Sequence, residues 1–274
     1  MKRSWYASPY ALWMVLFAVV PLVFVCWYAF TTPEGAFTLQ NFQEFSKPRY
    51  AAVILRSLKH ALYCTVLCLL IGYPTAYFLA GRGFTHAQSL VVLILLPMWM
   101  NMLLRTYAMM SLLDDNGVLN AALTAIGIAP VKVIGTEGAV LMGLVYNYLP
   151  FMVLPIYTVL KKMDFSVIEA AEDLGCNPLR VITRVVIPMS VLGIVSGITM
   201  VFMPAVTSFA ISTLLSNGKI RLAGDLIDYI FNQSSNPTRW NIGSSFSLIM
   251  LVLILLSIGF LRKVDPDSEG GGMW

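Results

Sequence analysis

The chain contains 274 residues, of which 58% are hydrophobic and 12% are charged, and its mean hydropathy is +0.77. Soluble domains carry about 25% charged residues and cannot bury so large an apolar fraction, so a soluble enzyme, a disordered regulator and a secreted disulfide scaffold are excluded. The net charge of +4 is small, and no dense basic stripe indicates a nucleic-acid partner. The composition predicts an all-α membrane protein in contact with lipid.

Six stretches without Asp, Glu, Lys or Arg follow one another along the chain. Each has about 20 residues or more, which is the length a helix needs to cross roughly 30 Å of hydrocarbon. We therefore predict six transmembrane helices, at residues 4–33, 61–81, 83–104, 138–160, 185–218 and 240–261. The first stretch is too long for the apolar part of a signal peptide, so we expect it to be an uncleaved first span.

Prolines lie inside five of these spans. Each proline removes one backbone hydrogen bond and kinks its helix. They fit either the ordinary irregularity of membrane helices or broken helices that line a pathway, and the sequence leaves both interpretations open. The six prolines are Pro21, Pro74, Pro97, Pro150, Pro155 and Pro204.

The segment 116–131, between the third and fourth spans, is apolar but short. We predict an interfacial helix on the outer side here, rather than a seventh span.

Basic residues next to span ends indicate the orientation in the membrane. The 18 Lys and Arg residues divide equally between the two sides, so their number does not decide it. Lys2 and Arg3 adjoin the start of the first span, whereas the next positive residue beyond that span is Lys47. The fourth span ends directly at Lys161 and Lys162, and the sixth ends directly at Arg262 and Lys263. Because such residues favour the cytoplasmic side, we predict that both termini are cytoplasmic.

The loop between the fourth and fifth spans contains signals for a short separate helix. Ser166 and Glu169 have the spacing of a capping box, which predicts a helix from about Val167. Gly175 supplies a left-handed stop, and Asn177 followed by proline predicts the start of a second helix.

This short helix has two different sides. One side is acidic and the other is narrow and apolar, and the residues concerned are Glu169, Glu172, Asp173, Ala170, Ala171 and Leu174. Such a helix is suited to the groove of another protein, although a solvated elbow between spans would show the same local signals.

The spacing of this loop resembles the EAA motif of ABC importer permeases, E-A-A-x3-G-x9-I-x-L-P. Residues 169–171 are followed by Gly175 at the motif's spacing and then by Val185-x-Ile187-Pro188, with two conservative replacements. The resemblance implies a type I ABC importer permease fold with a cytoplasmic coupling helix between helices 4 and 5. In the family this helix docks in a cleft of the cytoplasmic ATPase. The coupling residues would be Glu169, Ala170, Ala171, Leu174 and Gly175.

Further motifs resemble the spermidine/putrescine branch of these permeases. They are Pro97-x-Trp99, Leu104-Arg105-Thr106-Tyr107, Gly117-Val118-Leu119-Asn120 and Leu149-Pro150-Phe151. Permeases for iron, for sulfate-like anions or for amino acids remain alternatives, because other small-solute branches share parts of these motifs. A channel or secondary-carrier subunit is a further alternative, but it predicts charged residues inside the spans, and the spans as drawn contain none.

The resemblance also implies a division of the chain and a set of partners. Residues 1–49 would form an N-terminal transmembrane helix and outer arm, residues 50–264 the permease core, and residues 265–274 a disordered cytoplasmic tail. The partners would be a cytoplasmic ABC ATPase dimer, an extracytoplasmic substrate-binding protein and a second permease, either a related sister chain or an identical one. The complex would lie in the bacterial inner membrane.

We expect no catalytic or metal-binding set in this chain. It lacks the G-x-x-x-x-G-K-[ST] phosphate loop, H-E-x-x-H and G-x-S-x-G. ATP and Mg²⁺ would therefore belong to the partner ATPase.

A path for flexible polyamine cations needs aromatic faces and carboxylate or carbonyl oxygens. The residues that we predict for it are Trp99, Tyr107, Tyr146, Phe151, Phe209 and Asp225. Aromatic residues also serve packing and interface belts. Arg105 does not suit a cation path, and it would either extend outward to the interface or pair with an acid of a neighbouring subunit. Gly193 and Gly197 form a G-x-x-x-G that packs within the chain or against a second permease.

Overall fold

A computed structural model describes residues 8–44, 47–81, 87–232 and 237–264. Within these ranges the chain is helical, and its one β-type pairing is an isolated bridge between Thr31 and Phe37. The predicted tail at 265–274 lies outside the described residues. The all-α prediction is confirmed.

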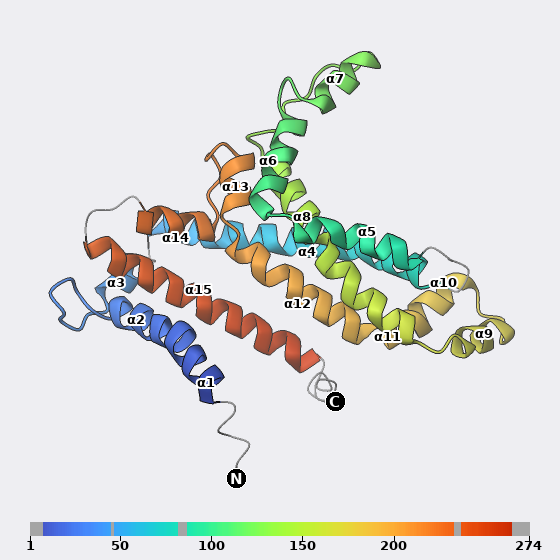
Figure 1. The fold of residues 1–274 in the computed structure, drawn as a ribbon, viewed down its shortest axis with the longest axis horizontal. Helices are drawn as coiled ribbons and strands as arrows, with labels where there is room; N and C mark the ends of the chain where they lie inside the picture. The colour runs from blue at the N-terminus through green and yellow to red at the C-terminus, as the bar shows by residue number, and fades with distance from the viewer. Residues whose placement is uncertain (1–7, 45–46, 82–86, 233–236, 265–274) are drawn as a thin grey trace, which may run out of the picture.

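The helices form an elongated bundle (Figure 1). In chain order they are α1 (Ser8–Met14), the π-helical turn η1 (Val15–Val19), α2 (Val20–Ala29), α3 (Gln40–Gln43), α4 (Pro48–Ala80), α5 (Ala87–Trp99), α6 (Met102–Leu113), α7 (Val118–Ala125), α8 (Glu137–Lys162), α9 (Ser166–Asp173), α10 (Pro178–Val181), the π-helical turn η3 (Ile182–Val186), α11 (Ile187–Met189), α12 (Val191–Thr207), α13 (Ala210–Leu215), α14 (Ala223–Asn232) and α15 (Pro237–Val264).

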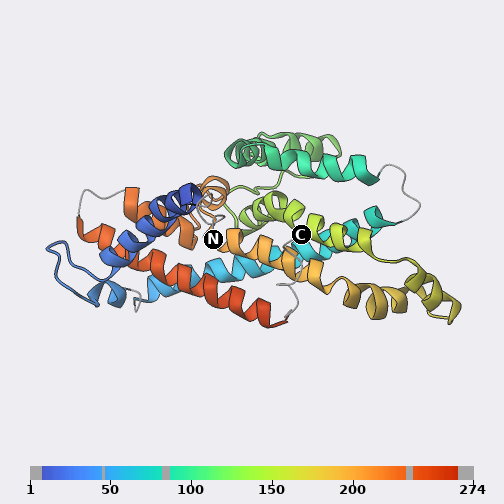
Figure 2. The same cartoon turned by 60° about the horizontal axis from the view of Figure 1, so that its bottom comes forward.

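The six predicted spans correspond to four uninterrupted helices and two bent pairs. The uninterrupted ones are Pro9–Ala29, Pro48–Ala80, Glu137–Lys162 and Arg239–Gly259. Ser89–Trp99 and Met102–Ala125 meet at 98°, and Pro178–Met189 and Val191–Thr207 meet at 70°. With each bent pair counted as one span, all six predicted stretches are accounted for. In Figure 2 the teal and green segment from α5 to α7 lies apart on one face of the bundle.

The break between α5 and α6 has a local cause. Asn101 lies at the break, and its side-chain Oδ1 accepts a hydrogen bond from the N–H of Leu103 at 2.8 Å, which caps α6. Pro97 stands inside the last turn of α5, just before the break. Pro74, Pro150, Pro155 and Pro204 lie inside helices that continue past them, so these prolines belong to ordinary helix irregularity.

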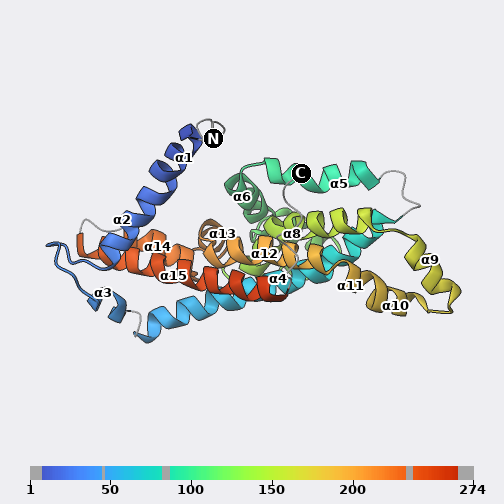
Figure 3. The same cartoon turned by 90° about the horizontal axis from the view of Figure 1, so that it is seen from below.

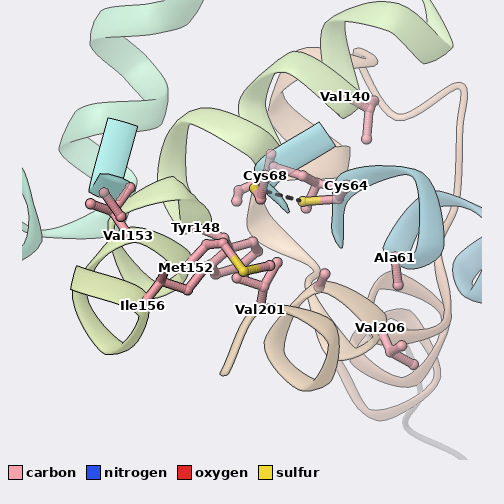
Figure 4. Packing of buried hydrophobic residues seen from close by; sticks show 14 of the residues in the cluster. Ala61, Cys64, Cys68, Val140, Tyr148, Met152, Val153, Ile156, Val201 and Val206 are labelled. Carbon is pink, nitrogen blue, oxygen red and sulfur yellow. Dashed lines mark hydrogen bonds between the residues drawn. The ribbon is translucent and has the colours of Figure 1, made fainter. Parts of the chain in front are cut away.

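The core lies where α4, α8 and α12 pack side by side. Figure 4 shows Tyr148, Met152 and Ile156 of α8 facing buried residues of the neighbouring helices. Gly193 and Gly197 bring α12 against α8. A Cβ at Gly193 would lie 3.0 Å from the Cα of Ile156, and one at Gly197 would lie 2.7 Å from the Met152 sulfur. This G-x-x-x-G therefore packs within the chain. The alternative prediction, that these glycines contact a second permease, is wrong.

The first span and its arm are attached to the last helix. α2 packs along α15, and the side-chain Nδ2 of Asn241 donates to the carbonyl oxygens of Thr31 at 2.6 Å and Tyr28 at 3.1 Å. Asn41 donates from the arm to the carbonyls of Ala29 and Thr31, both at 3.0 Å. Buried amide side chains thus tie the segment before α4 to the body of the protein.

Segment 116–131 forms a hairpin rather than a seventh span. Its helix α7 has 8 residues, about 12 Å of helix, which is too short to cross a membrane. Asn120 closes the hairpin, because its Oδ1 accepts from the N–H of Val131 at 2.9 Å and its Nδ2 donates back to the Val131 carbonyl at 3.2 Å.

Candidate functional site

The predicted short helix is present as α9, but its first turn is capped differently from the prediction. Ser166 is already the first helical residue, and the carboxylate of Asp164 accepts a hydrogen bond from its N–H at 3.0 Å. The predicted capping box with Ser166 as the cap is therefore wrong. Asp164 lies two residues earlier in the sequence and provides a charged acceptor at the positive end of the helix.

The end of α9 follows the prediction. Gly175 has a φ of 79°, a left-handed conformation that L side chains rarely adopt. The N–H of Cys176 donates to the carbonyl of Ala171 at 3.1 Å, and the N–H of Gly175 donates to that of Glu172 at 2.8 Å, which is the Schellman arrangement. Asn177 then caps α10 through its Oδ1, which accepts from the N–H of Leu179 at 2.7 Å. The turn between α9 and α10 is thus fixed by backbone hydrogen bonds.

The two sides of α9 differ in what they contact. Ile168 is buried and Ala171 packs with it against the protein core. Ala170 and Leu174 face outward, and the Leu174 side chain is 86% exposed. The residues of the predicted apolar side therefore differ in their surroundings. Ala171 packs against the protein core, whereas Leu174 is exposed.

α9 and α10 form one extreme end of the molecule, away from α3 and α14 (Figures 1 and 3). An apolar hollow of about 410 Å³ lies beside α9, between the ends of α4 and α8. Tyr77, Leu160 and Phe165 are among the residues that line it. The segment from α9 to α10 thus projects from the bundle, and the apolar hollow lies next to the start of this segment.

The aromatic residues predicted for a substrate path lie in three regions. Trp99, 82% exposed, and Tyr107 flank the bend between α5 and α6. Phe209 lies between α12 and α13 and borders a cavity of about 370 Å³ beside α14. On α8, Tyr146 is exposed and Phe151 is half-buried. The structure does not bring these aromatic residues together around one cavity, and their role stays a prediction.

Asp225 of α14 is only 7% exposed and is held inside the chain. Its carboxylate accepts hydrogen bonds from the hydroxyls of Ser212 and Thr213 and from the N–H of Leu222. Burial raises the pKa of this carboxyl above its ordinary value, although the three hydrogen bonds act in the opposite direction. The sequence reasoning missed Ser212 and Thr213, because a Ser-Thr pair twelve residues upstream is too common to indicate a carboxylate partner.

Asp225 also borders a cavity of about 280 Å³. Asp228, Tyr229 and Thr213 line the same cavity, together with Arg221. Two carboxylates and an aromatic ring are groups that bind ammonium cations. Arg221 lies 4.2 Å from the centre of the Tyr229 ring, so a cation of the chain itself already stands over that ring. A role for Asp225 in the substrate path stays a prediction.

Arg105 of α6 is a buried cation that has no counter-ion among the described residues. It is 7% exposed, and its Nε and Nη1 atoms have no hydrogen-bond partner. Within the described ranges no carboxylate lies within 4.0 Å of it, and its charge acts on the phenol of Tyr148 in α8. The suggestion that Arg105 extends outward to the interface is wrong. Pairing with an acid of a neighbouring subunit stays a prediction.

Comparison with protein families identifies the chain. Residues 4–269 match the family described as the inner membrane component of binding-protein-dependent transport systems. The chain belongs to this family. It is thus a membrane permease component, as the resemblance of its loop to the EAA motif predicted.

Curated relatives of this permease cover most of its length. It is 37% identical over 254 residues to the spermidine/putrescine transport system permease protein PotB of Haemophilus influenzae, which covers 90% of this chain and 88% of that protein. It is 35% identical to the PotB permease of Escherichia coli K12, over 90% of this chain and 91% of that protein.

A solved structure shares the fold of this permease. A chain of a bacterial alginate ABC transporter, solved in complex with an alginate pentasaccharide-bound periplasmic protein, superposes with a TM-score of 0.75. The match covers 97% of this chain and 96% of the other at 18% identity. The type I ABC importer permease fold is confirmed, while the similarity at this level carries no statement about substrate.

Proposed function

We propose that this permease forms the membrane path of an ATP-driven importer for polyamines such as spermidine and putrescine. The observation that carries the proposal is 37% and 35% identity, over 90% of the chain, to permeases named for spermidine/putrescine transport.

In this proposal α9 couples the permease to its energy source. The exposed Leu174 and the acidic residues of α9 enter a cleft of a cytoplasmic ABC ATPase, while Ile168 keeps the helix attached to the permease core. ATP and Mg²⁺ bind to that ATPase, and this chain hydrolyses no ATP. Closure of an ATPase dimer would then move α9 as a rigid unit and turn the path toward the outer side.

The same proposal sets the orientation and the assembly. Lys161 and Lys162 end α8 next to α9, and basic residues at a span end favour the cytoplasmic side. The end that holds α9 would therefore be cytoplasmic, with both termini on that side, and the end that holds α14 would face the substrate-binding protein. A second permease, a sister chain or a second copy, would complete the path and supply an acid to Arg105.

Uptake by reconstituted vesicles tests the proposed substrate. The permease, its ATPase and its binding protein are incorporated with labelled spermidine or putrescine outside, and a neutral and an anionic solute compete in separate assays. We expect ATP-dependent accumulation of the polyamine that neither competitor reduces. Accumulation of a competitor with no polyamine uptake would overturn the proposed substrate and leave the family assignment intact.

A further inference from the structure

Three arginines converge on a cavity at the end of the molecule opposite α9. Arg49 at the start of α4, Arg221 in the loop before α14 and Arg239 at the start of α15 line a pocket of about 420 Å³. Glu44 is the one carboxylate among its lining residues, and it lies 2.5 Å from the Nζ of Lys47. Within the described part of the chain none of the three arginines has an ion pair, so the lining carries a net positive charge, although Arg221 also borders the neighbouring cavity that holds Asp225 and Asp228.

Two of the three guanidinium groups are held in place by tyrosine rings. Arg49 lies 4.4 Å from the centre of the Tyr50 ring, and Arg221 lies 4.2 Å from the centre of the Tyr229 ring. The Tyr50 ring in turn packs edge-on against the buried Phe246 at 5.0 Å. Arg49 and Arg221 are therefore oriented before anything binds, which lowers the entropy lost on binding.

The backbone that carries Arg221 is also fixed. The next residue, Leu222, donates its N–H to the Asp225 carboxylate at 2.8 Å. The N–H of Ala223 donates to the hydroxyl of Ser57 in α4 at 2.6 Å. Buried Leu226 and Ile230 also line the pocket. The pocket thus combines buried apolar side chains with arginines, one of which is carried by a fixed backbone.

The pocket lies at the α14 end of the bundle. The α14 end, where the pocket lies, and the α9 end are at opposite extremes of the long axis (Figures 1 and 3). Its arginines stand at the first turns of α4 and α15 and in a loop, rather than along the sides of the long helices. A cationic polyamine would be repelled here, so the occupant is an anion.

We propose that this pocket receives carboxylate side chains from an acidic surface of the extracytoplasmic substrate-binding protein. The inference rests on the proposed function, which places the α14 end outside. Planar guanidinium groups bind carboxylates through paired hydrogen bonds, and a volume of about 420 Å³ admits a few acidic side chains rather than a whole protein loop. Complementary charge at this position would also speed the encounter of the two proteins.

Docking measured at several salt concentrations tests the inference. The transporter is assembled in lipid nanodiscs without anionic lipid, and binding of its purified, spermidine-loaded binding protein is recorded for wild type and for the triple variant Arg49→Gln, Arg221→Gln, Arg239→Gln. We expect docking to weaken about tenfold or more and its dependence on salt to become shallower. The single variant Lys219→Gln removes an exposed cation two residues from Arg221 and outside the pocket, and it should dock as wild type does.

Two results would overturn the inference. Equal docking affinity in the wild type and the triple variant would show that the pocket is not a docking site. A triple variant that docks normally but loses retention of anionic lipid in a parallel lipid-binding assay would assign the pocket to lipid phosphate. Neither result affects the polyamine assignment, because uptake of labelled spermidine by the wild-type complex decides that separately.

Discussion

Two buried charges, Asp225 and Arg105, show what single residues contribute to this permease. The Asp225 carboxylate accepts three hydrogen bonds inside the chain, whereas the Arg105 guanidinium has unpartnered nitrogens. The sequence drew attention to both residues but predicted neither environment. The hydroxyl partners of Asp225, Ser212 and Thr213, lie in α13, which packs against α14. No local sequence pattern predicts that α13 and α14 come together.

Removal of the Asp225 carboxylate should destabilise the loop between α13 and α14. Asp225→Ala leaves the buried N–H of Leu222 without its acceptor, which costs about 1–3 kcal/mol, whereas the hydroxyl of Ser212 can still donate to the carbonyl of Phe209. Asp225→Asn keeps an oxygen for the N–H and should lose less. Unfolding monitored in detergent by denaturant titration gives these values, and Asp228→Ala, at an exposed position, is the control. Equal stability of Asp225→Ala and Asp228→Ala would contradict this account of Asp225.

Replacement of Arg105 should affect transport without lowering the stability of the isolated chain. A buried charge that lacks a counter-ion is costly, so an apolar residue of similar length is neutral or stabilising. We expect Arg105→Met to unfold in detergent at the same or a higher denaturant concentration than wild type, while uptake by the assembled transporter falls. A clearly less stable isolated Arg105→Met chain would contradict this account, because it would show that Arg105 makes stabilising interactions within one chain.

At the scale of elements, α9 and the α5–α6 bend differ in how far local sequence determines them. The end of α9 and the start of α10 follow from Gly175 and Asn177, whose effects need no tertiary contact. The break after Trp99 was not predicted, because similar prolines lie inside four other helix positions without ending them. The α5–α6 break differs from these positions in having Asn101, which caps α6. This capping role cannot be predicted without knowing that α5 ends before Asn101.

The left-handed turn after α9 gives a matched pair of glycine variants. Gly175 and Gly127 both have a φ of 79° and open space around them. Alanine at either position costs about 1–2 kcal/mol of backbone strain. We expect only Gly175→Ala to lower substrate-stimulated ATP hydrolysis by the assembled transporter, because it tilts α9, whereas Gly127→Ala perturbs the end of α7. Equal ATPase loss in both variants would show that the effect is general strain.

The close crossing of α8 and α12 depends on Gly193. A Cβ there would lie 3.0 Å from both the Cα of Ile156 and the carbonyl oxygen of Pro155, and backbone atoms cannot move aside cheaply. We expect Gly193→Ala to lower the free energy of unfolding by about 1–3 kcal/mol. Gly259→Ala meets nothing within 4 Å and should be neutral or slightly stabilising. If the two variants unfold alike, then the helices do not cross as closely as described.

At the scale of the whole molecule, the permease has two chemically different ends. The helices α9 and α14 lie toward opposite ends of the long axis (Figure 1). The α9 end carries the exposed Leu174, and the α14 end carries the arginine pocket. Composition and charge-free stretches predicted the helical membrane body between them. The pocket was not predicted, because Arg49, Arg221 and Arg239 are far apart in sequence and meet only through the packing of α4, α14 and α15.

The central claim is that ATP hydrolysis by a partner drives polyamine import through α9. Its most direct test records spermidine accumulation and ATP hydrolysis in the same proteoliposomes, with wild type, Leu174→Asp and the control Val118→Asp, an exposed apolar position on α7. The account predicts ATP-dependent accumulation in wild type and Val118→Asp, and loss of both accumulation and stimulated hydrolysis in a folded Leu174→Asp. Undiminished ATP-dependent accumulation in Leu174→Asp would contradict coupling through α9, and absence of spermidine accumulation in an ATP-hydrolysing wild type would contradict polyamine import.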